Sequence, residues 1–167
     1  MVDRPGTIVA VPFPQSLVPM QPMLGKPFHR PGWVYEEKYD GWRMLAFKDG
    51  LRVRLISRQG VDYTERFREL AAAVAALKAP TLILDGEVCV FDKNLISQFH
   101  LLDRSVSEEP CTPPVFMAFD CLHVHGLDVR GLHSTAVARC SSTKLPGLRW
   151  STPPVVCQIT DSPPGLS

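Results

Sequence analysis

The uneven placement of proline is the feature that most limits where this chain can form regular structure. Seven of its 16 prolines fall within residues 1–32 and five within residues 133–167, whereas the hundred residues between them hold four. Proline fixes φ and lacks a backbone N–H, so proline-rich stretches interrupt helices and the interior of sheets. We therefore expect an extended lead-in over residues 1–32, ordered structure from about Trp33, and a loose tail.

Size and composition exclude several classes of protein. The chain has 167 residues, enough for one domain, and its formal net charge of +1 gives no general attraction to nucleic acid. It contains no apolar run long enough to span a membrane and no signal-peptide pattern at its start. Its five cysteines are odd in number and lack CxxC spacing, which argues against a disulfide framework or a zinc site. A reducing, cytoplasmic setting is expected.

The middle of the chain begins with a hairpin pattern followed by a helix pattern. Strand-like runs at 43–48 and 51–56 flank an Asp-Gly pair, which is typical of a tight β-hairpin turn. Apolar residues then recur at helical spacing over 67–77. Asp62 and Glu65 offer a capping box at the start of this helix, and Pro80 ends it.

The second half of the folded part reads mainly as strands. We expect strands at 81–84 and 87–91 on either side of an Asp85-Gly86 turn. Further elements are a strand at 34–37, a short helix at 96–102 and a strand at 115–124. Short turns between strands favour antiparallel pairing, so the predicted fold class is α+β, with mostly antiparallel sheets and flanking helices.

Four charged or aromatic motifs follow one another along this region. They are KYDGWR at 38–43, SRQG at 57–60, LDGE at 84–87 and FMAFD at 116–120. Each alone could be an ordinary turn, loop or core strand. Their joint order and spacing resemble the ATP-dependent DNA ligases and the wider superfamily of covalent nucleotidyltransferases, over residues 20–132. The resemblance implies an incomplete ATP-grasp-like adenylation domain.

The resemblance also implies a reaction and its participants. In the family, the lysine of the first motif attacks the α-phosphate of ATP, pyrophosphate leaves, and a lysyl-adenylate forms before a DNA nick is sealed in repair or recombination. The implied cofactors are ATP and Mg²⁺ or Mn²⁺. The implied partner is nicked DNA, in a bacterial cytosol or nucleoid, with weak binding by this chain alone.

The resemblance also implies roles for individual residues, through the motifs that match the family. Lys38 would be the catalytic nucleophile, and Arg43 and Arg58 would offer fork-shaped donors to the nucleotide. Glu87 would hold the ribose hydroxyl or help to place a metal ion.

Two further residues are implied to contact the base. Glu36 lies two positions before the lysine and would recognise the adenine amino group. Phe119 would stack on the adenine. The structural alternatives are a solvated strand residue for Glu36 and a core aromatic for Phe119.

The family pattern stops after residue 132. The family's later glutamate and closely spaced lysine motifs have no counterpart, since no glutamate follows Glu109 and Lys144 is the only lysine after Lys93. We therefore expect residues 33–132 to form a partial adenylation domain and residues 133–167, rich in Ser, Thr and Pro, to be disordered or frame-shifted. Three alternatives remain: a truncated DNA ligase domain, a relative of RNA ligases or capping guanylyltransferases, and a non-catalytic nucleotide-binding remnant.

Overall fold

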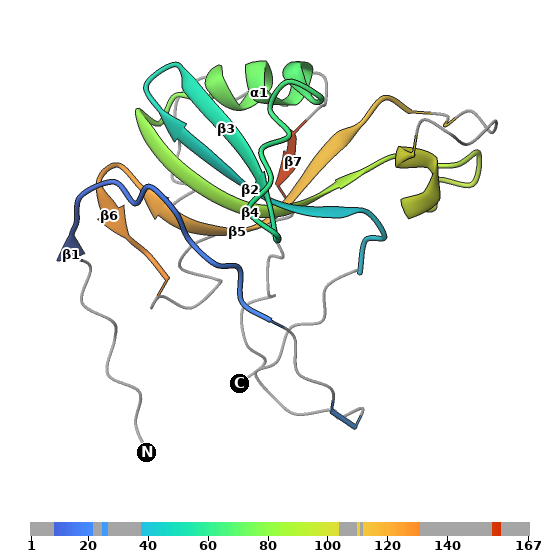
Figure 1. The fold of residues 1–167 in the computed structure, drawn as a ribbon, viewed down its shortest axis with the longest axis horizontal. Coiled ribbons are helices and arrows are strands. Elements are labelled where there is room, and N and C mark those ends of the chain that lie inside the picture. The colour runs from blue at the N-terminus through green and yellow to red at the C-terminus, as the bar shows by residue number, and fades with distance from the viewer. Residues whose placement is uncertain are drawn as a thin grey trace, which may run out of the picture.

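The protein is described by a computed structural model in which strands dominate. It describes residues 9–21, 25–26, 38–103, 110, 112–130 and 155–157. The expected strand at 34–37, and Glu36 with it, lie outside the described residues. In chain order the elements are β1 (Val9–Ala10), β2 (Trp42–Asp49), β3 (Arg52–Ser57), α1 (Arg68–Ala75), β4 (Thr81–Cys89), the 3-10 helix η1 (Phe99–Leu102), β5 (Val115–Val124), β6 (Leu127–Asp128) and β7 (Val155–Cys157) (Figure 1).

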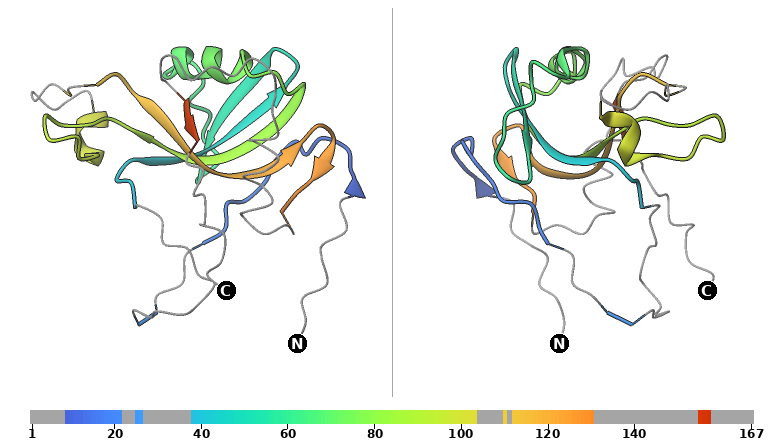
Figure 2. Two further views of the ribbon diagram at one scale, coloured as in Figure 1. Left: turned by 180° about the vertical axis from the view of Figure 1, so that it is seen from behind. Right: turned by 45° about the vertical axis from the view of Figure 1, so that its right-hand side comes forward.

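The described strands form one curved sheet. Their order is β1-β6-β5-β4-β2-β3, and β7 pairs with β5 beside this path. Every pairing is antiparallel except that of β7, which runs parallel to β5. Figure 2 shows the curvature of the sheet, with α1 lying over one of its faces. The predicted α+β class with mostly antiparallel strands is confirmed.

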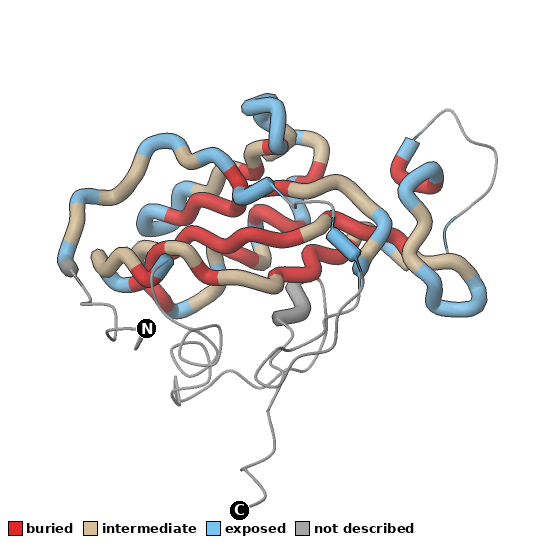
Figure 3. Tube along the Cα trace, turned by 90° about the horizontal axis from the view of Figure 1, so that it is seen from below, coloured by how far each residue is buried: buried red, intermediate tan, exposed pale blue. Residues whose placement is uncertain are grey.

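The sheet is covered on both faces, and its central strands are buried (Figure 3). Successive residues of a strand point to opposite faces, so β2 supplies both cores. On one face, Met44 and Ala46 belong to the cluster that includes Leu70 and Val74 of α1. On the other face, a second cluster joins strand residues to the N-terminal segment: Leu45, Phe47 and Ile83 pack with Phe13, Leu17, Ile56 and Leu122.

The predicted hairpin between β2 and β3 is confirmed. The two strands pair from Met44↔Ser57 to Asp49↔Arg52. Gly50 in the connecting turn has a φ of 58°, a left-handed conformation that glycine adopts without steric cost.

The predicted helix forms, but it is shorter than its apolar pattern suggested. It begins at Arg68 after the N-cap residue Phe67, which makes no side-chain cap hydrogen bond. The predicted capping box is wrong. Asp62 Oδ1 instead accepts hydrogen bonds from the Thr64 backbone N–H at 2.9 Å and from its hydroxyl at 2.5 Å. Asp62 therefore closes a local turn before the helix rather than capping it.

The predicted turn at Asp85-Gly86 is also wrong, because β4 runs unbroken from Thr81 to Cys89. This strand lies between β2 and β5, and Asp85 pairs with Leu45 on one side and Asp120 on the other. A Cβ on Gly86 would lie 2.6 Å from the Met117 carbonyl oxygen. Glycine is therefore needed here for close approach of strands, not for a turn.

β5 carries irregularities opposite this part of β4. The register shifts between Ile83 and Leu84 and again between Asp85 and Gly86. Phe119 lies at the second shift, between the paired residues Ala118 and Asp120. Such bulges bend a strand and redirect a side chain.

Ordered structure starts earlier than Trp33. β1 pairs with β6, and the Val11 backbone N–H donates to the Gly126 carbonyl at 3.0 Å. In the predicted tail, β7 at 155–157 is a strand, while 131–154 and 158–167 lie outside the described residues. The expected 96–102 helix is the shorter η1, and the strand at 115–124 is confirmed.

Candidate active site

A cleft of about 500 Å³ brings together three of the four motifs. Residues of the first motif, at the start of β2, form one part of its lining, and the loop after β3 forms another. The lining residues are Gly41, Trp42, Arg43, Ser57, Arg58, Gln59, Val61, Tyr63, Glu87 and Phe99. Antiparallel pairing of β2 with both β3 and β4 places these segments, distant in sequence, at one end of the sheet.

Lys38 lies just before β2 and its side chain is exposed. It does not line the cleft itself. Its positive charge nevertheless lowers the pKa of Glu87, which places the amine within electrostatic reach of that carboxylate.

Arg43 occupies the centre of the site. Its Nε donates to Asp85 Oδ1 at 3.0 Å and its Nη2 donates to Asp85 Oδ2 at 2.8 Å. Its Nη1 donates to the Met20 carbonyl at 2.8 Å, and the guanidinium lies 5.5 Å from the centroid of the Phe119 ring. The hydrogen bonds to Asp85 raise the pKa of Arg43. The guanidinium is therefore anchored within the protein rather than free to follow a ligand.

Asp85 is the site residue that sequence reasoning missed. Its side chain is 4% exposed, against 22% for that of Arg43. Reading Asp85-Gly86 as a turn hid the alternation that puts Asp85 and Glu87 on the same face of β4. That spacing was the available signal, since two acids two residues apart in a strand point the same way.

Glu87 is directly opposite Arg43 in the β2–β4 ladder. Burial raises the pKa of the Glu87 carboxyl to about 7. Three smaller effects lower this pKa: the charge of Arg43, a hydrogen bond from the Gly41 backbone N–H, and the charge of Lys38. At neutral pH this carboxyl therefore exchanges between its neutral and charged forms, and can donate or accept a hydrogen bond.

The first-motif glycine allows this arrangement. A Cβ on Gly41 would lie 2.2 Å from the Val88 carbonyl oxygen and 3.0 Å from Glu87 Cγ. Any side chain here would push the loop that carries Lys38 away from β4.

The second motif contributes an ordered turn with an exposed arginine. Within the loop after β3, the Gly60 N–H donates to the Ser57 carbonyl at 2.9 Å, and Gly60 has a φ of 82°. Arg58 and Gln59 project from this turn and line the cleft.

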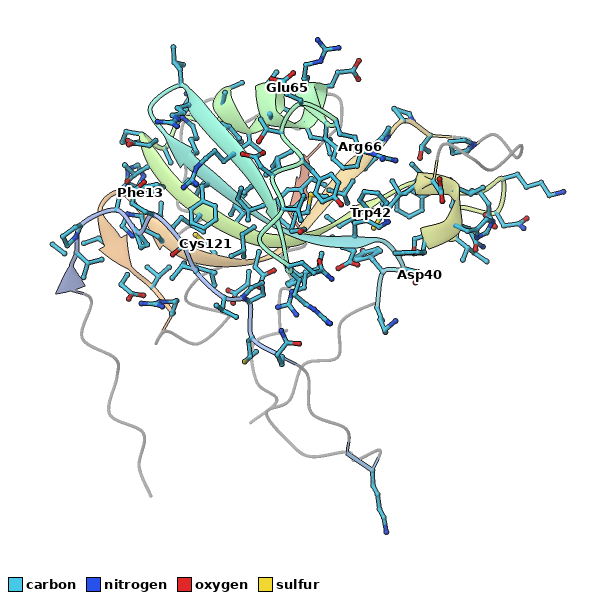
Figure 4. The ribbon with its side chains drawn as sticks, viewed as in Figure 1. Phe13, Asp40, Trp42, Glu65, Arg66 and Cys121 are labelled. Carbon is cyan, nitrogen blue, oxygen red and sulfur yellow. The ribbon has the colours of Figure 1, made fainter. Side chains whose placement is uncertain are left out.

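Aromatic side chains form a further part of the lining. Trp42 packs edge-on against Tyr63, with 5.2 Å between the ring centroids. The Phe99 ring centroid lies 6.4 Å from that of Trp42, and 52% of the surface of Phe99 is exposed. Arg66 lies over the Trp42 ring, with its Cζ 4.6 Å from the ring centroid. Figure 4 labels both residues. Phe119, predicted to stack on adenine, is not among the lining residues and instead faces Arg43.

A metal ion finds little support in the described part of the chain. No group of three or more His, Cys, Asp or Glu side chains gathers there. Glu87 lies beside two cations, and Asp85 is engaged with Arg43. These residues do not fit a protein-built magnesium site, and we derive no step through a metal ion.

Comparisons with known proteins agree with this geometry. A family model described as ATP dependent DNA ligase domain matches residues 19–139. Multifunctional non-homologous end joining protein LigD of Pseudomonas aeruginosa is 33% identical over 119 residues, covering 71% of this chain and 14% of that protein. DNA ligase C2 of Mycolicibacterium smegmatis is 33% identical over 124 residues, covering 69% of this chain and 35% of that protein.

Solved structures give the same relationship. The crystal structure of the ligase domain of Mycobacterium tuberculosis LigD has a TM-score of 0.58 and 27% identity, covering 74% of this chain and 39% of that one. A structure of mycobacterial DNA ligase D complexed with ATP and MES has a TM-score of 0.55 and 30% identity, covering 65% of this chain and 35% of that one.

The fold and the cleft thus define the nucleotidyltransferase class, in the form of part of an adenylation domain. Within that class, the chain belongs to the ATP-dependent DNA ligase domain family. It spans 14% and 35% of the two named curated relatives. No helix in the described ranges is long and apolar enough to cross a membrane.

Proposed function

We propose that this chain binds ATP at the cleft and forms a lysyl-adenylate on Lys38. The observation that carries the proposal is the meeting of three motif segments around one cleft, with the charges of Lys38 and Arg43 acting on the Glu87 carboxyl. The neighbouring ligase D structure complexed with ATP supports the choice of nucleotide.

In the proposed step, the neutral Lys38 amine attacks the α-phosphorus of ATP. A nitrogen–phosphorus bond forms, the bond from that phosphorus to the bridging oxygen breaks, pyrophosphate leaves, and the amine loses a proton to solvent. Glu87 would hydrogen-bond a ribose hydroxyl, which suits a carboxyl with a pKa of about 7.

Arginines would orient the nucleotide in two different ways. Arg58 is exposed on the cleft, so its guanidinium could close on phosphate oxygens. Arg43, held by Asp85, would present its remaining N–H groups at a fixed place. We retain Glu36 as the proposed adenine contact, and propose that Phe119 stacks on the base only if its packing on Arg43 changes.

The fuller role is proposed from the named relatives. They are a DNA ligase and a non-homologous end joining protein, so nicked DNA in repair is the proposed downstream partner. We further propose that residues 33–132 form the adenylating part. We expect slow adenylation and no nick sealing by residues 1–167 alone, because they hold no counterpart of the family's later lysine motif.

The test is covalent labelling with α-³²P-labelled ATP or GTP and magnesium. We expect label from ATP that survives denaturation, disappears in Lys38→Ala and persists in the control Lys93→Ala, an exposed lysine outside the cleft. Label from GTP in place of ATP would contradict the choice of nucleotide. Absence of any label after prolonged incubation would overturn the proposed lysyl-adenylate formation.

A further inference from the structure

The loop that carries Lys38 is hydrogen-bonded to a segment almost sixty residues away. The Asp40 backbone N–H donates to Ser97 Oγ at 2.8 Å. In return, the Phe99 backbone N–H donates to Asp40 Oδ2 at 3.2 Å. These two bonds, here called the Asp40 clamp, fix both the backbone and the side chain of the residue two positions after Lys38.

The partner segment is itself held in place. Ser97 forms an isolated β-bridge with Phe91, and the Gln98 backbone N–H donates to the Val90 carbonyl at 3.1 Å. The Gln98 side chain donates to Asp92 Oδ2 at 3.1 Å. The clamp therefore ties the Lys38 loop to a fixed support next to the end of β4.

Gly41, the next residue toward β2, is fixed as well. Gly41 packs against the Val88 carbonyl so tightly that no Cβ fits, and its N–H is bonded to Glu87. The clamp and this contact fix the two residues that lead from β2 back toward Lys38, and Tyr39, between Asp40 and Lys38, packs against the cluster that contains Cys89. Figure 4 shows Asp40 below Trp42, on the segment that leads into β2.

We propose that Ser97 is a positioning residue for adenylation, acting through Asp40 on Lys38. The inference rests on the proposed function, because it concerns the placement of the same nucleophile. Small misplacements of a reacting group lower a rate far more than they lower binding of the substrate. Loss of the Ser97 acceptor should therefore slow transfer to Lys38 while ATP still binds.

The test compares three variants of the full chain. Ser97→Ala removes the hydroxyl acceptor, and Ser97→Thr keeps it. Thr81→Ala removes a similar acceptor at the opposite end of β4, since Thr81 Oγ1 accepts from the Gly126 backbone N–H at 2.9 Å. Single-turnover labelling with ATP gives the transfer rate and the dependence on ATP concentration. We expect about a tenfold slower transfer in Ser97→Ala with half-saturation within threefold of the parent chain. Ser97→Thr and Thr81→Ala should transfer within about threefold of the parent rate.

A second readout works without turnover. By NMR hydrogen exchange in the absence of ATP, the Asp40 amide should exchange at least fivefold faster in Ser97→Ala than in the parent chain or Ser97→Thr. Equal exchange in all three would overturn the inference, as would an unchanged transfer rate in Ser97→Ala or an equal loss in Thr81→Ala. If the parent chain takes no label at all, the proposed function fails, and the Asp40 exchange alone decides whether the clamp holds the loop.

Discussion

The half-buried Glu87 carboxyl makes a definite prediction for the pH dependence of stability. Burial raises its pKa to about 7 from the ordinary 4.5. The folded chain therefore holds this proton more tightly than the unfolded chain. Relative to a neutral side chain at this position, Glu87 lowers stability progressively as the pH rises from about 4.5 to about 7, and the loss stays constant above that range.

The size of the effect follows from the two pKa values. Each pKa unit corresponds to about 1.4 kcal/mol, which gives about 3 kcal/mol for the whole interval. Part of the interval between the two pKa values lies below pH 5 and does not count in a comparison of pH 5 with pH 8. Partial contact of the carboxyl with solvent reduces the free-energy difference that remains. We therefore expect Glu87→Gln to gain about 2 kcal/mol more stability over the parent chain at pH 8 than at pH 5.

Urea unfolding followed by tryptophan fluorescence at the two pH values measures this difference. Glutamine keeps an oxygen that accepts from the Gly41 N–H, so the variant changes the charge and little else. Glu65→Gln, at an exposed position outside the cleft, reports the effect of removing a carboxyl in general. If the gain from Glu87→Gln is equal at pH 5 and pH 8, or larger at pH 5, the reasoning about burial is refuted.

Two further predictions concern β4. Gly86→Ala should destabilise the fold by about 3 kcal/mol in urea unfolding, because the new Cβ would lie 2.6 Å from the Met117 carbonyl oxygen. The control Gly25→Ala, whose Cβ would meet nothing within 4 Å, should change stability by less than about 0.5 kcal/mol. A Gly86→Ala chain as stable as the parent would contradict the close approach. Asp85→Asn should cost about 2 kcal/mol by the same measurement, because Arg43 loses the carboxylate that accepts two of its hydrogen bonds. This cost should shrink in Arg43→Met, where no cation needs a partner. Equal costs in both backgrounds would show that the pair is not coupled.

The sequence predicted those parts of the fold that local chemistry determines. The β2–β3 hairpin follows from Asp49-Gly50, and the strand at 115–124 follows from its continuous apolar run. The convergence of Arg43, Arg58 and Glu87 on one cleft was also expected from their motifs.

The failures came from tertiary context. An Asp-Gly pair normally breaks a strand, but Asp85 remains inside β4 because Arg43 of the neighbouring strand neutralises it and donates two hydrogen bonds. That pairing joins residues 42 positions apart, and no local pattern encodes it. Asp62 likewise satisfied a capping pattern, yet it found a nearer partner in Thr64.

The contacts of Arg43 also bear on the order in which the molecule folds. They join it to Met20, Asp85 and Phe119, which lie 23, 42 and 76 residues away. Contacts of such long separation close large loops and form slowly, so this centre can be complete only when the sheet is nearly assembled. A nucleotide that binds there would recognise the finished fold alone, and its binding energy would be added to the stability of the N-terminal segment that supplies Met20.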